Sequence, residues 1–357
     1  MTLTTTTKRQ LTTIASVTLI SMLAGAAYPL IFAPPQQPTA PVWHSSLNGI
    51  MIGFFLGLAV SLGELFLFRS RLRRLRFSIF LLVQTLYYLA AIHLAIVAVM
   101  SWHLVVFHGF TFAATLASPE FTQFVFGEQG LKVNIYALVV TFLINYIRQV
   151  NRMLGQNALL NFITGKYHKS VEEERVFMFL DLKASTAMAE RLGPKRYHRL
   201  LDDFFHDITP AVVESKGEIY QYVGDEVVVT WTKERGLNEA NCINCYFRVV
   251  AAIAQVSDKY ERRYGLVPTF KAGYHYGTVI TGLVGDIKRD IVFHGDTVNI
   301  ASRIRSECTT VDRPLLLSGE LLKHLSISSY LTPENMGKIK LRGKEEETEL
   351  YAIREAA

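Results

Sequence analysis

Cysteine is scarce in this 357-residue sequence, which contains only Cys242, Cys245 and Cys308. Three cysteines are too few for a disulfide framework, and they favour a reducing compartment for the part of the chain that holds them. Cys242 and Cys245 fall within a helical pattern, and the sequence has no second pair of this spacing. Neither a zinc site nor a redox motif is therefore expected there.

Charge is also scarce in the first 150 residues, where Leu, Ile, Val, Phe and Ala dominate. A helix needs roughly 20 mostly apolar residues to cross a hydrocarbon core. Four stretches meet this requirement, namely residues 11–32, 47–68, 77–100 and 131–147. Residues 1–147 are therefore expected to form an all-α membrane domain of four transmembrane helices. The apolar segment 102–117 leaves three alternatives open: an extension of the third helix, a re-entrant piece or a fifth span.

The positions of the positive charges predict the orientation. Lys8 and Arg9, five arginines within 69–76, and Arg148 with Arg152 alternate with segments 33–46 and 118–130, which lack Lys and Arg. Positive charge marks the cytoplasmic side, so four crossings place the N-terminus and the C-terminal half in the cytoplasm. The net charge of +6 is then explained by membrane flanks, and no nucleic-acid partner is expected. The predicted location is the inner (plasma) membrane, as a multi-pass protein in contact with lipid.

Two polar residues inside the spans have more than one interpretation. Glu64 precedes Arg69 by about one helical turn, which favours a paired or snorkelling carboxylate near the interface. His93 lies in the middle of a span, and His103 and His108 follow it. A hydrogen bond between helices is the commoner use of such a histidine, and ligation of a haem or contact with a quinone is the alternative.

From about residue 172 onward, charged residues occur in every block of ten, as in an ordinary soluble domain. Residues 148–170 have a helical spacing of apolar positions, which indicates a linker that is either a single amphipathic helix or a dimerising transmitter. The segment 171–357 reads as strand, helix, hairpin, helix, strands, helix and strands. This order predicts an α/β (α+β) domain with a mixed sheet covered by helices. Residues 269–284 are expected to form two strands broken at Gly277.

Two acids stand at strand ends in this domain. Asp181 closes the first strand, and Asp225 occupies the turn of the hairpin. Paired carboxylates that share a metal with substrate phosphates are the usual way to hold Mg²⁺. From spacing alone, however, a strand-end acid and a turn acid explain these residues equally well.

Four sequence blocks decide between these alternatives. The runs FLDLKASTAMAE, GEIYQYVGDEVVVTW, GYHYGTVITGLVGD and FHGDTVNIASRI occur in this order. Together they resemble the class III adenylyl and guanylyl cyclase catalytic domain over about residues 176–353. The resemblance implies a ferredoxin-like core and a membrane-anchored adenylate cyclase that forms cyclic AMP and pyrophosphate from ATP.

The resemblance also implies a set of site residues. Asp181 and Asp225 match the family's two metal-binding aspartates, and the carbonyl of Leu182 often adds a ligand; two ions, Mg²⁺ or Mn²⁺, are expected. Asn299 and Arg303 match the pair that orients the ribose and stabilises the transition state, and an i, i+4 spacing places both on one helix face. The expected phosphate-binding residues are Lys183, Ala184, Ser185, Thr186 and Lys344. Because the family builds each site from two catalytic domains, one copy per chain implies a homodimer.

The sequence departs from the family at the positions that read the base. Typical adenylyl cyclases have Lys where Gln221 stands, and Asp or Thr where Val292 stands. Gln221 can pair with adenine or turn its amide to suit guanine, and Val292 offers no hydrogen bond. No Glu is present to accept from guanine, as is typical of guanylyl cyclases. ATP is therefore the predicted substrate, with GTP or dual specificity as the alternative. A catalytically silent, nucleotide-sensing membrane scaffold is the alternative from another class.

Overall fold

The computed structural model describes residues 5–32, 42–68, 77–154, 158–326 and 331–355. The chain divides into two compact units, Met1–Val150 and Asn151–Ala357. The predicted boundaries at residues 147 and 170 stay predictions. The five arginines of 69–76 lie outside the described residues.

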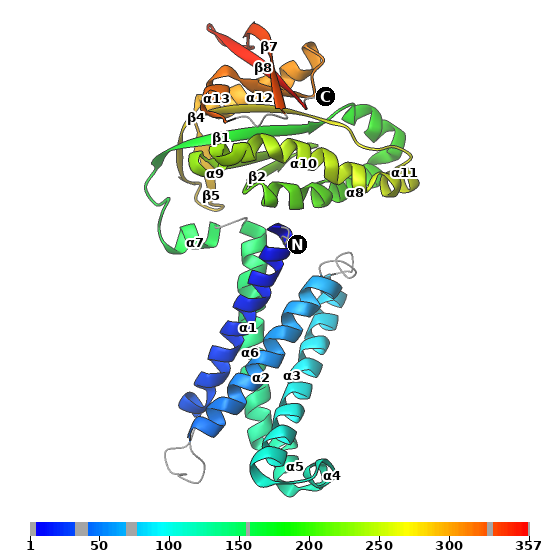
Figure 1. The fold of residues 1–357 in the computed structure, drawn as a ribbon, viewed down its shortest axis with the longest axis vertical. Helices are drawn as coiled ribbons and strands as arrows, with labels where there is room; N and C mark the ends of the chain where they lie inside the picture. Colours follow the sequence, from blue (N-terminus) through cyan, green and yellow to red (C-terminus); the bar gives the residue numbers. More distant parts are fainter. Residues whose placement is uncertain (1–4, 33–41, 69–76, 155–157, 327–330, 356–357) are drawn as a thin grey trace. The chain divides into compact units, whose positions relative to one another are not determined.

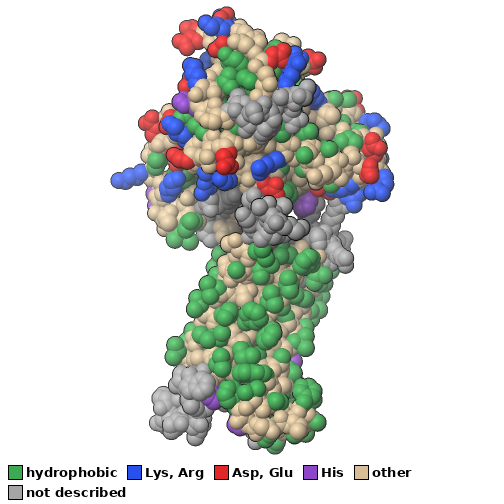
Figure 2. Space-filling view, in the orientation of Figure 1, with side chains coloured by type: hydrophobic (Ala, Val, Ile, Leu, Met, Phe, Trp, Pro, Cys, Tyr) green, Lys and Arg blue, Asp and Glu red, His purple; other side chains and the backbone are tan. Residues whose placement is uncertain are grey.

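Four long helices form the first unit (Figure 1). They are α1 (Thr5–Phe32), α2 (Val42–Gly63), α3 (Phe77–His108) and α6 (Glu128–Leu154), and a π-helical turn, η1 (Glu64–Phe68), follows α2. Each holds a segment long and apolar enough to cross a membrane by length and composition. Figure 2 shows hydrophobic side chains over much of the visible face of this unit. The prediction of four apolar helices is confirmed.

The segment 102–117 does not form a further long helix. Its first part extends α3 as far as His108, and its last part forms the six-residue helix α4 (Phe112–Ala117), which α5 (Pro119–Phe126) follows. Six residues rise only about 9 Å along a helix axis, too little to cross a membrane. The structure thus supports an extension of the third helix for residues 102–108 and no fifth long helix within 102–117.

Glycines allow α1 and α2 to pack closely. A Cβ atom added at Gly25 would lie 2.0 Å from the carbonyl oxygen of Gly49, and one added at Gly53 would lie 2.2 Å from that of Ser21. Larger side chains at these positions would therefore push the helices apart. Small residues are the usual means of close helix packing in membranes, where apolar burial alone drives little association.

A polar network occupies the interior of this helical unit. Glu64 is 4% exposed, and its Oε1 accepts a hydrogen bond from Gln84 Nε2 at 3.1 Å. The Tyr88 hydroxyl lies 3.3 Å from Glu64 Oε1 and 3.2 Å from Asn145 Oδ1. The network joins η1, α3 and α6, so Glu64 is a buried, hydrogen-bonded residue. Its predicted partner, Arg69, lies outside the described residues.

The histidines of the spans lie against neighbouring side chains. The His93 ring is 5.7 Å from the Phe126 ring, and His103 Nδ1 is 3.1 Å from Asn48 Nδ2 of another helix. These contacts are of the kind that the helix-packing interpretation expects, and ligation of a cofactor stays an untested alternative.

The second unit is an eight-stranded mixed sheet with helices on both faces (Figure 1). The strand order is β2-β3-β1-β4-β6-β8-β7, β5 pairs with β4, and only β4 and β6 run parallel among the described pairs. The strands are β1 (Val171–Leu182), β2 (Glu218–Val223), β3 (Glu226–Thr232), β4 (Phe270–Val284), β5 (Asp290–His294), β6 (Leu315–Ser318), β7 (Leu331–Lys340) and β8 (Glu347–Glu355). The helices are α7 (Ala158–Ile163), α8 (Ser185–Glu214), α9 (Lys233–Leu237), η2 (Asn238–Ala240), α10 (Asn241–Gln255), α11 (Ser257–Tyr264), α12 (Asp296–Thr310) and α13 (Gly319–His324). The predicted α+β fold with a mixed sheet covered by helices is confirmed.

Successive side chains of β1 point to opposite faces of the sheet, as in any β-strand. Met178 and Leu180 are fully buried in the core that α8, α10 and α11 cover. Phe177 and Phe179 pack on the opposite face with Ala301 of α12. Asp181 continues this second series, so its side chain belongs to the face that α12 covers.

The prediction of a break at Gly277 is wrong, because β4 runs without interruption from Phe270 to Val284. A Cβ atom at Gly277 would lie 2.7 Å from Thr297 Oγ1, and one at Gly273 would lie 2.1 Å from the backbone nitrogen of Arg305. The two glycines therefore provide room for α12 to lie directly on the strand. They mark close packing rather than a turn.

Candidate active site

Three neighbouring strands bring charged side chains into one row. In the sheet register, Asp181 of β1 lies opposite Glu226 of β3 on one side and opposite Lys271 of β4 on the other. Directly opposed residues point to the same face of a sheet. Asp225 adjoins the row, because it lies in the turn between β2 and β3 after Gly224, whose φ is 63°. The turn thus presents Asp225 at the edge where β1 ends.

These residues surround a pocket of about 440 Å³. The start of α8 forms another part of its wall. Its lining residues are Asp181, Leu182, Ala184, Ser185, Thr186, Val223, Asp225, Glu226, Lys271 and Arg305. The structure thus brings together both predicted metal aspartates and all of the predicted loop residues except Lys183.

Two cations face the acids in this pocket. Arg305 Nη1 donates to Asp181 Oδ2 at 3.2 Å, and its Nε lies 2.8 Å from Glu226 Oε2 in an ion pair that lacks the angle of a hydrogen bond. Lys271 Nζ lies 3.5 Å from Asp181 Oδ2 and donates to Thr309 Oγ1 at 2.9 Å. The pocket therefore holds three carboxylates and two fixed positive charges.

The crowding of acids changes their protonation. Burial raises the pKa of Asp181 above its usual value, and the negative charge and hydrogen bonding of Asp225 add to the rise, while Arg305 and Lys271 oppose it. Burial, together with the charges of Asp181 and Asp225, raises the pKa of Glu226 to about 7 against the opposition of Arg305. Carboxylates that repel one another in a partly buried pocket are stabilised by a bound cation.

The donor set fits Mg²⁺ or Mn²⁺ better than a metal that the protein encloses completely. The described residues contain no group of three or more His, Cys, Asp or Glu side chains arranged to hold a metal. Mg²⁺ is usually held by one or two carboxylates, with water and substrate phosphates completing its shell. Asp181 and Asp225 supply that number of carboxylates, and the open pocket leaves room for phosphate oxygens.

The first turn of α8 forms the other wall. Ala184 precedes the helix in the left-handed conformation, with a φ of 53°, and no side-chain cap bonds to the described first turn. Ser185 and Thr186, two of the predicted phosphate-binding residues, are the first two residues of this helix. The backbone N–H groups of this turn carry the partial positive charge of a helix N-terminus. An anion in the pocket would therefore meet these N–H groups and Lys271.

Asn299 and Arg303 lie on α12 and do not line this pocket. Arg303 instead borders a separate hollow of about 360 Å³ with Ser306, Glu307, Arg342 and Gly343. Its Nη1 atom is buried and has no hydrogen-bond partner among the described residues. Within the described part of one chain, the predicted metal half and the predicted Asn–Arg half of the site are therefore separate.

Three other predicted site residues, Lys344, Gln221 and Val292, do not line the acidic pocket. Lys344 Nζ forms a hydrogen bond and ion pair with Asp296, the first residue of α12. Gln221 is exposed on β2 opposite Val228, and Val292 is half-buried on β5 opposite Gly282. The rings of Tyr220 and Phe293, the chain neighbours of Gln221 and Val292, are 4.9 Å apart. This contact joins the segments that hold Gln221 and Val292, the two positions predicted to read the base.

Sequence reasoning missed Lys271, Glu226 and Arg305. Glu226 follows Asp225 directly, so its proximity was available from the sequence. Lys271 and Arg305 reach Asp181 only through the pairing of β4 with β1 and the packing of α12 on β4. No local pattern marks either residue.

Comparison with known proteins agrees with the family resemblance that the sequence of the second unit indicates. A family model described as "Adenylate and Guanylate cyclase catalytic domain" matches residues 167–355. "Adenylate cyclase 2" of Rhizobium meliloti (strain 1021) is 36% identical over 215 residues, which are 60% of this chain and 59% of that protein. "Adenylate cyclase" of Anabaena cylindrica is 26% identical over 187 residues, 50% of this chain and 36% of that protein. The chain thus spans three fifths or less of the length of these relatives.

A solved structure has the same fold. A bacterial light-regulated adenylyl cyclase superposes with a TM-score of 0.55 at 21% identity, covering 65% of this chain and 68% of that one.

Proposed function

Because the chain belongs to the adenylate and guanylate cyclase catalytic domain family, we propose that it is an adenylate cyclase anchored in a membrane by its four apolar helices. It converts ATP to 3′,5′-cyclic AMP and pyrophosphate. The observation that carries the proposal is the pocket in which Asp181 and Asp225 meet Lys271 and the start of α8. The relative with 36% identity is named an adenylate cyclase, which favours ATP.

Asp181, Asp225 and the carbonyl of Leu182 would hold two ions of Mg²⁺ or Mn²⁺. Such ions neutralise triphosphate charge and favour ionisation of the ribose 3′-hydroxyl, which supports an in-line displacement at phosphorus. The chain itself binds the triphosphate through the N–H groups of residues 184–186 and through Lys271, whereas the Lys183 N–H donates to the Thr269 carbonyl. These contacts position the α-phosphate for attack by the 3′-oxygen and for departure of pyrophosphate.

Asn299 orients the ribose, and Arg303 stabilises the charge that develops on the transferring phosphoryl oxygens. A buried guanidinium nitrogen of Arg303 without a described hydrogen-bond partner supports this role. Arg303 borders a hollow of its own rather than the acidic pocket, which supports a homodimer. Each of the two composite sites would then take its acids from one chain and its Asn–Arg pair from the other. Lys344, now paired with Asp296, would bind phosphate after leaving that carboxylate.

Gln221 and Val292 would meet the base. Since neither residue supplies a fixed acceptor for guanine, ATP is preferred, and a guanylate or dual-specificity cyclase is the alternative. The positive-inside pattern of the sequence supports a plasma-membrane protein whose N-terminus and catalytic domain are in the cytoplasm, where ATP is available. The exposed leucine and phenylalanine side chains of the four helices would contact lipid.

The test is a competition assay on the purified full-length chain with equimolar ATP and GTP and either Mg²⁺ or Mn²⁺. We expect cyclic AMP and pyrophosphate in equal amounts, with cyclic AMP in excess over cyclic GMP. An excess of cyclic GMP would establish the alternative substrate. Nucleotide binding without any cyclic product would instead establish a silent, nucleotide-sensing scaffold.

A further inference from the structure

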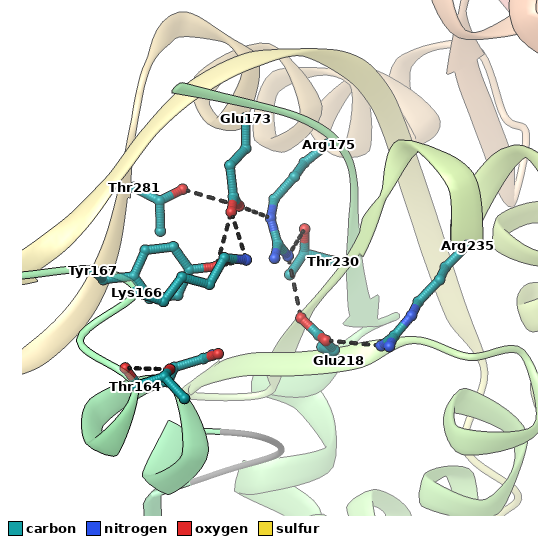
Figure 3. A network of polar contacts seen from close by, with 10 residues as sticks. Thr164, Lys166, Tyr167, Glu173, Arg175, Glu218, Thr230, Arg235 and Thr281 are labelled. Atoms are coloured by element: carbon teal, nitrogen blue, oxygen red, sulfur yellow. Dashed lines mark hydrogen bonds and ion pairs between the residues drawn. The ribbon is translucent and has the colours of Figure 1, made fainter. Parts of the chain in front are cut away.

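A buried arginine lies on β1 at a distance from the acidic pocket. Arg175 is 3% exposed. Its Nε donates to Glu173 Oε2 at 2.8 Å, and its Nη1 donates to Glu218 Oε2 at 3.2 Å (Figure 3). A guanidinium is costly to bury unless its donors are paired, and two carboxylates pair with this side chain and fix its position.

The guanidinium plane has a second neighbour. Its Cζ atom lies 4.6 Å from the centroid of the Phe293 ring, within the range of a cation–π contact. The same ring also packs against Phe177 at 5.4 Å and against Tyr220 at 4.9 Å. Arg175 and Phe177 are successive residues on one face of β1, so Phe293 lies over this face and holds β5 against it.

These contacts extend to both segments that hold the base-reading positions. Glu218 is on β2, three residues before Gln221, and Phe293 directly follows Val292. Arg175 therefore contacts β2 through its ion pair with Glu218, and β5 through the ring of Phe293. The contact between Tyr220 and Phe293 joins β2 to β5 directly. We propose that Arg175 is a positioning residue that sets the geometry of the base pocket, and so the selectivity between ATP and GTP. This inference rests on the proposed cyclase function.

The same cluster binds the segment that enters the domain. Glu173 accepts a hydrogen bond from the Tyr167 hydroxyl at 2.9 Å and pairs with Lys166 Nζ at 3.0 Å (Figure 3). Tyr167 is 3% exposed, and its carbonyl accepts from Leu283 N at 3.2 Å. A shift of this segment would therefore reach Arg175 through one shared carboxylate. The position of the segment before β1 thus influences nucleotide selectivity.

The experiment compares Arg175→Lys with Arg235→Ala in the full-length chain. Lysine keeps the charge, but it lacks the planar fork that binds two carboxylates and stacks on a ring. Arg235 is a matched control because it pairs with the other oxygen of Glu218, at 3.3 Å, and its side chain is 52% exposed. The readouts are kcat and KM for ATP and for GTP, the affinity for each nucleotide by competition with a fluorescent analogue, and thermal unfolding.

We expect Arg175→Lys to raise KM for ATP about fivefold and to change the ATP-to-GTP ratio of kcat/KM by about threefold or more, since the planar fork that pairs with Glu173 and Glu218 and stacks on Phe293 is lost. Arg235→Ala should leave the ratio within about twofold, as expected for an exposed pair. An Arg175→Lys variant with an unchanged ratio, whether or not its unfolding temperature falls, would reduce Arg175 to a structural ion pair and overturn the inference.

Tyr167→Phe keeps the inference testable if Arg175→Lys does not fold. This change removes one hydroxyl and should shift the same ratio in the same direction, by about twofold; an unchanged ratio would contradict the inference. Failure of the proposed function can be told apart from failure of this inference. A wild-type chain that forms no cyclic product refutes only the proposed function. The relative affinities for ATP and GTP in the two variants would still decide the role of Arg175.

Discussion

Separation of the acidic pocket from the hollow beside Arg303 leads to a quantitative prediction for mixed chains. On the proposed function, Asp225→Asn would disable the metal half of each site, and Arg303→Ala would disable the other half. If two chains build two composite sites, each variant alone is inactive. A dimer that contains one chain of each kind has one intact site and one doubly disabled site.

The expected recovery of cyclic AMP formation follows from the statistics with which the two variant chains pair. Equal co-expression of the two full-length variants gives about half mixed dimers, and each mixed dimer has one of two sites intact. We therefore expect about a quarter of wild-type cyclic AMP formation per chain. Asp225→Asn should not destabilise the fold, because the charge of Asp225 is one reason why the pKa of Asp181 is raised. Thermal unfolding of each variant checks this.

Asp225→Asn mixed with Asp181→Asn is the matched control. Both changes lie in the same half of the site, so every site in a mixed dimer keeps one disabled acid and no activity returns. Cyclic AMP measured in membranes from the two co-expressions gives the comparison. Equal recovery in both mixtures, or none in the first, would refute the assignment of the two halves to different chains.

Three further predictions concern single residues. Lys271→Ala should raise KM for ATP about tenfold, because a charged contact to phosphate is lost. Thr309→Ala, which removes the hydroxyl that accepts from Lys271, should leave KM unchanged. Steady-state kinetics of each variant check this, and an equal rise in KM in both would contradict it. Gly273→Ala should destabilise the domain by about 1–3 kcal/mol and lower activity, since its Cβ would lie 2.1 Å from the backbone of α12. Gly282→Ala is the control on the same strand, with its nearest neighbour at 3.5 Å, and thermal unfolding separates the two. Burial lowers the pKa of His275 to about 4, so between the ordinary value near 6.5 and pH 4 only the unfolded chain takes up this proton. Stability should therefore fall with falling pH in that window, by up to about 1.4 kcal/mol per pH unit, and His275→Gln should remove this part of the slope in unfolding measured against pH.

Much of the fold could be predicted from the sequence because its signals are local. The four apolar helices follow from composition, and the hairpin that holds Asp225 follows from a glycine turn between two apolar runs. Gly277 was misinterpreted because a glycine in a strand pattern marks either a turn or a close approach. Only the position of α12, which the local sequence does not specify, decides between these alternatives.

The site could be predicted only in part, for a related reason. Asp181 and Asp225 stand at recognisable strand ends, and the family resemblance relates them to Asn299. Lys271 reaches the pocket because the register of β4 places it directly opposite Asp181. A shift of one residue would turn Lys271 to the other face, and local patterns do not determine that register.

The most direct test of the central claim is the amount of cyclic AMP that purified full-length wild-type and Asp225→Asn chains form from ATP with saturating Mn²⁺. We expect cyclic AMP and pyrophosphate in equal amounts from the wild type. We expect a loss of about 100-fold or more in Asp225→Asn, because that change removes one of the two carboxylates proposed to hold the metal ions. A variant that forms cyclic AMP at the wild-type rate would contradict the role of the paired aspartates.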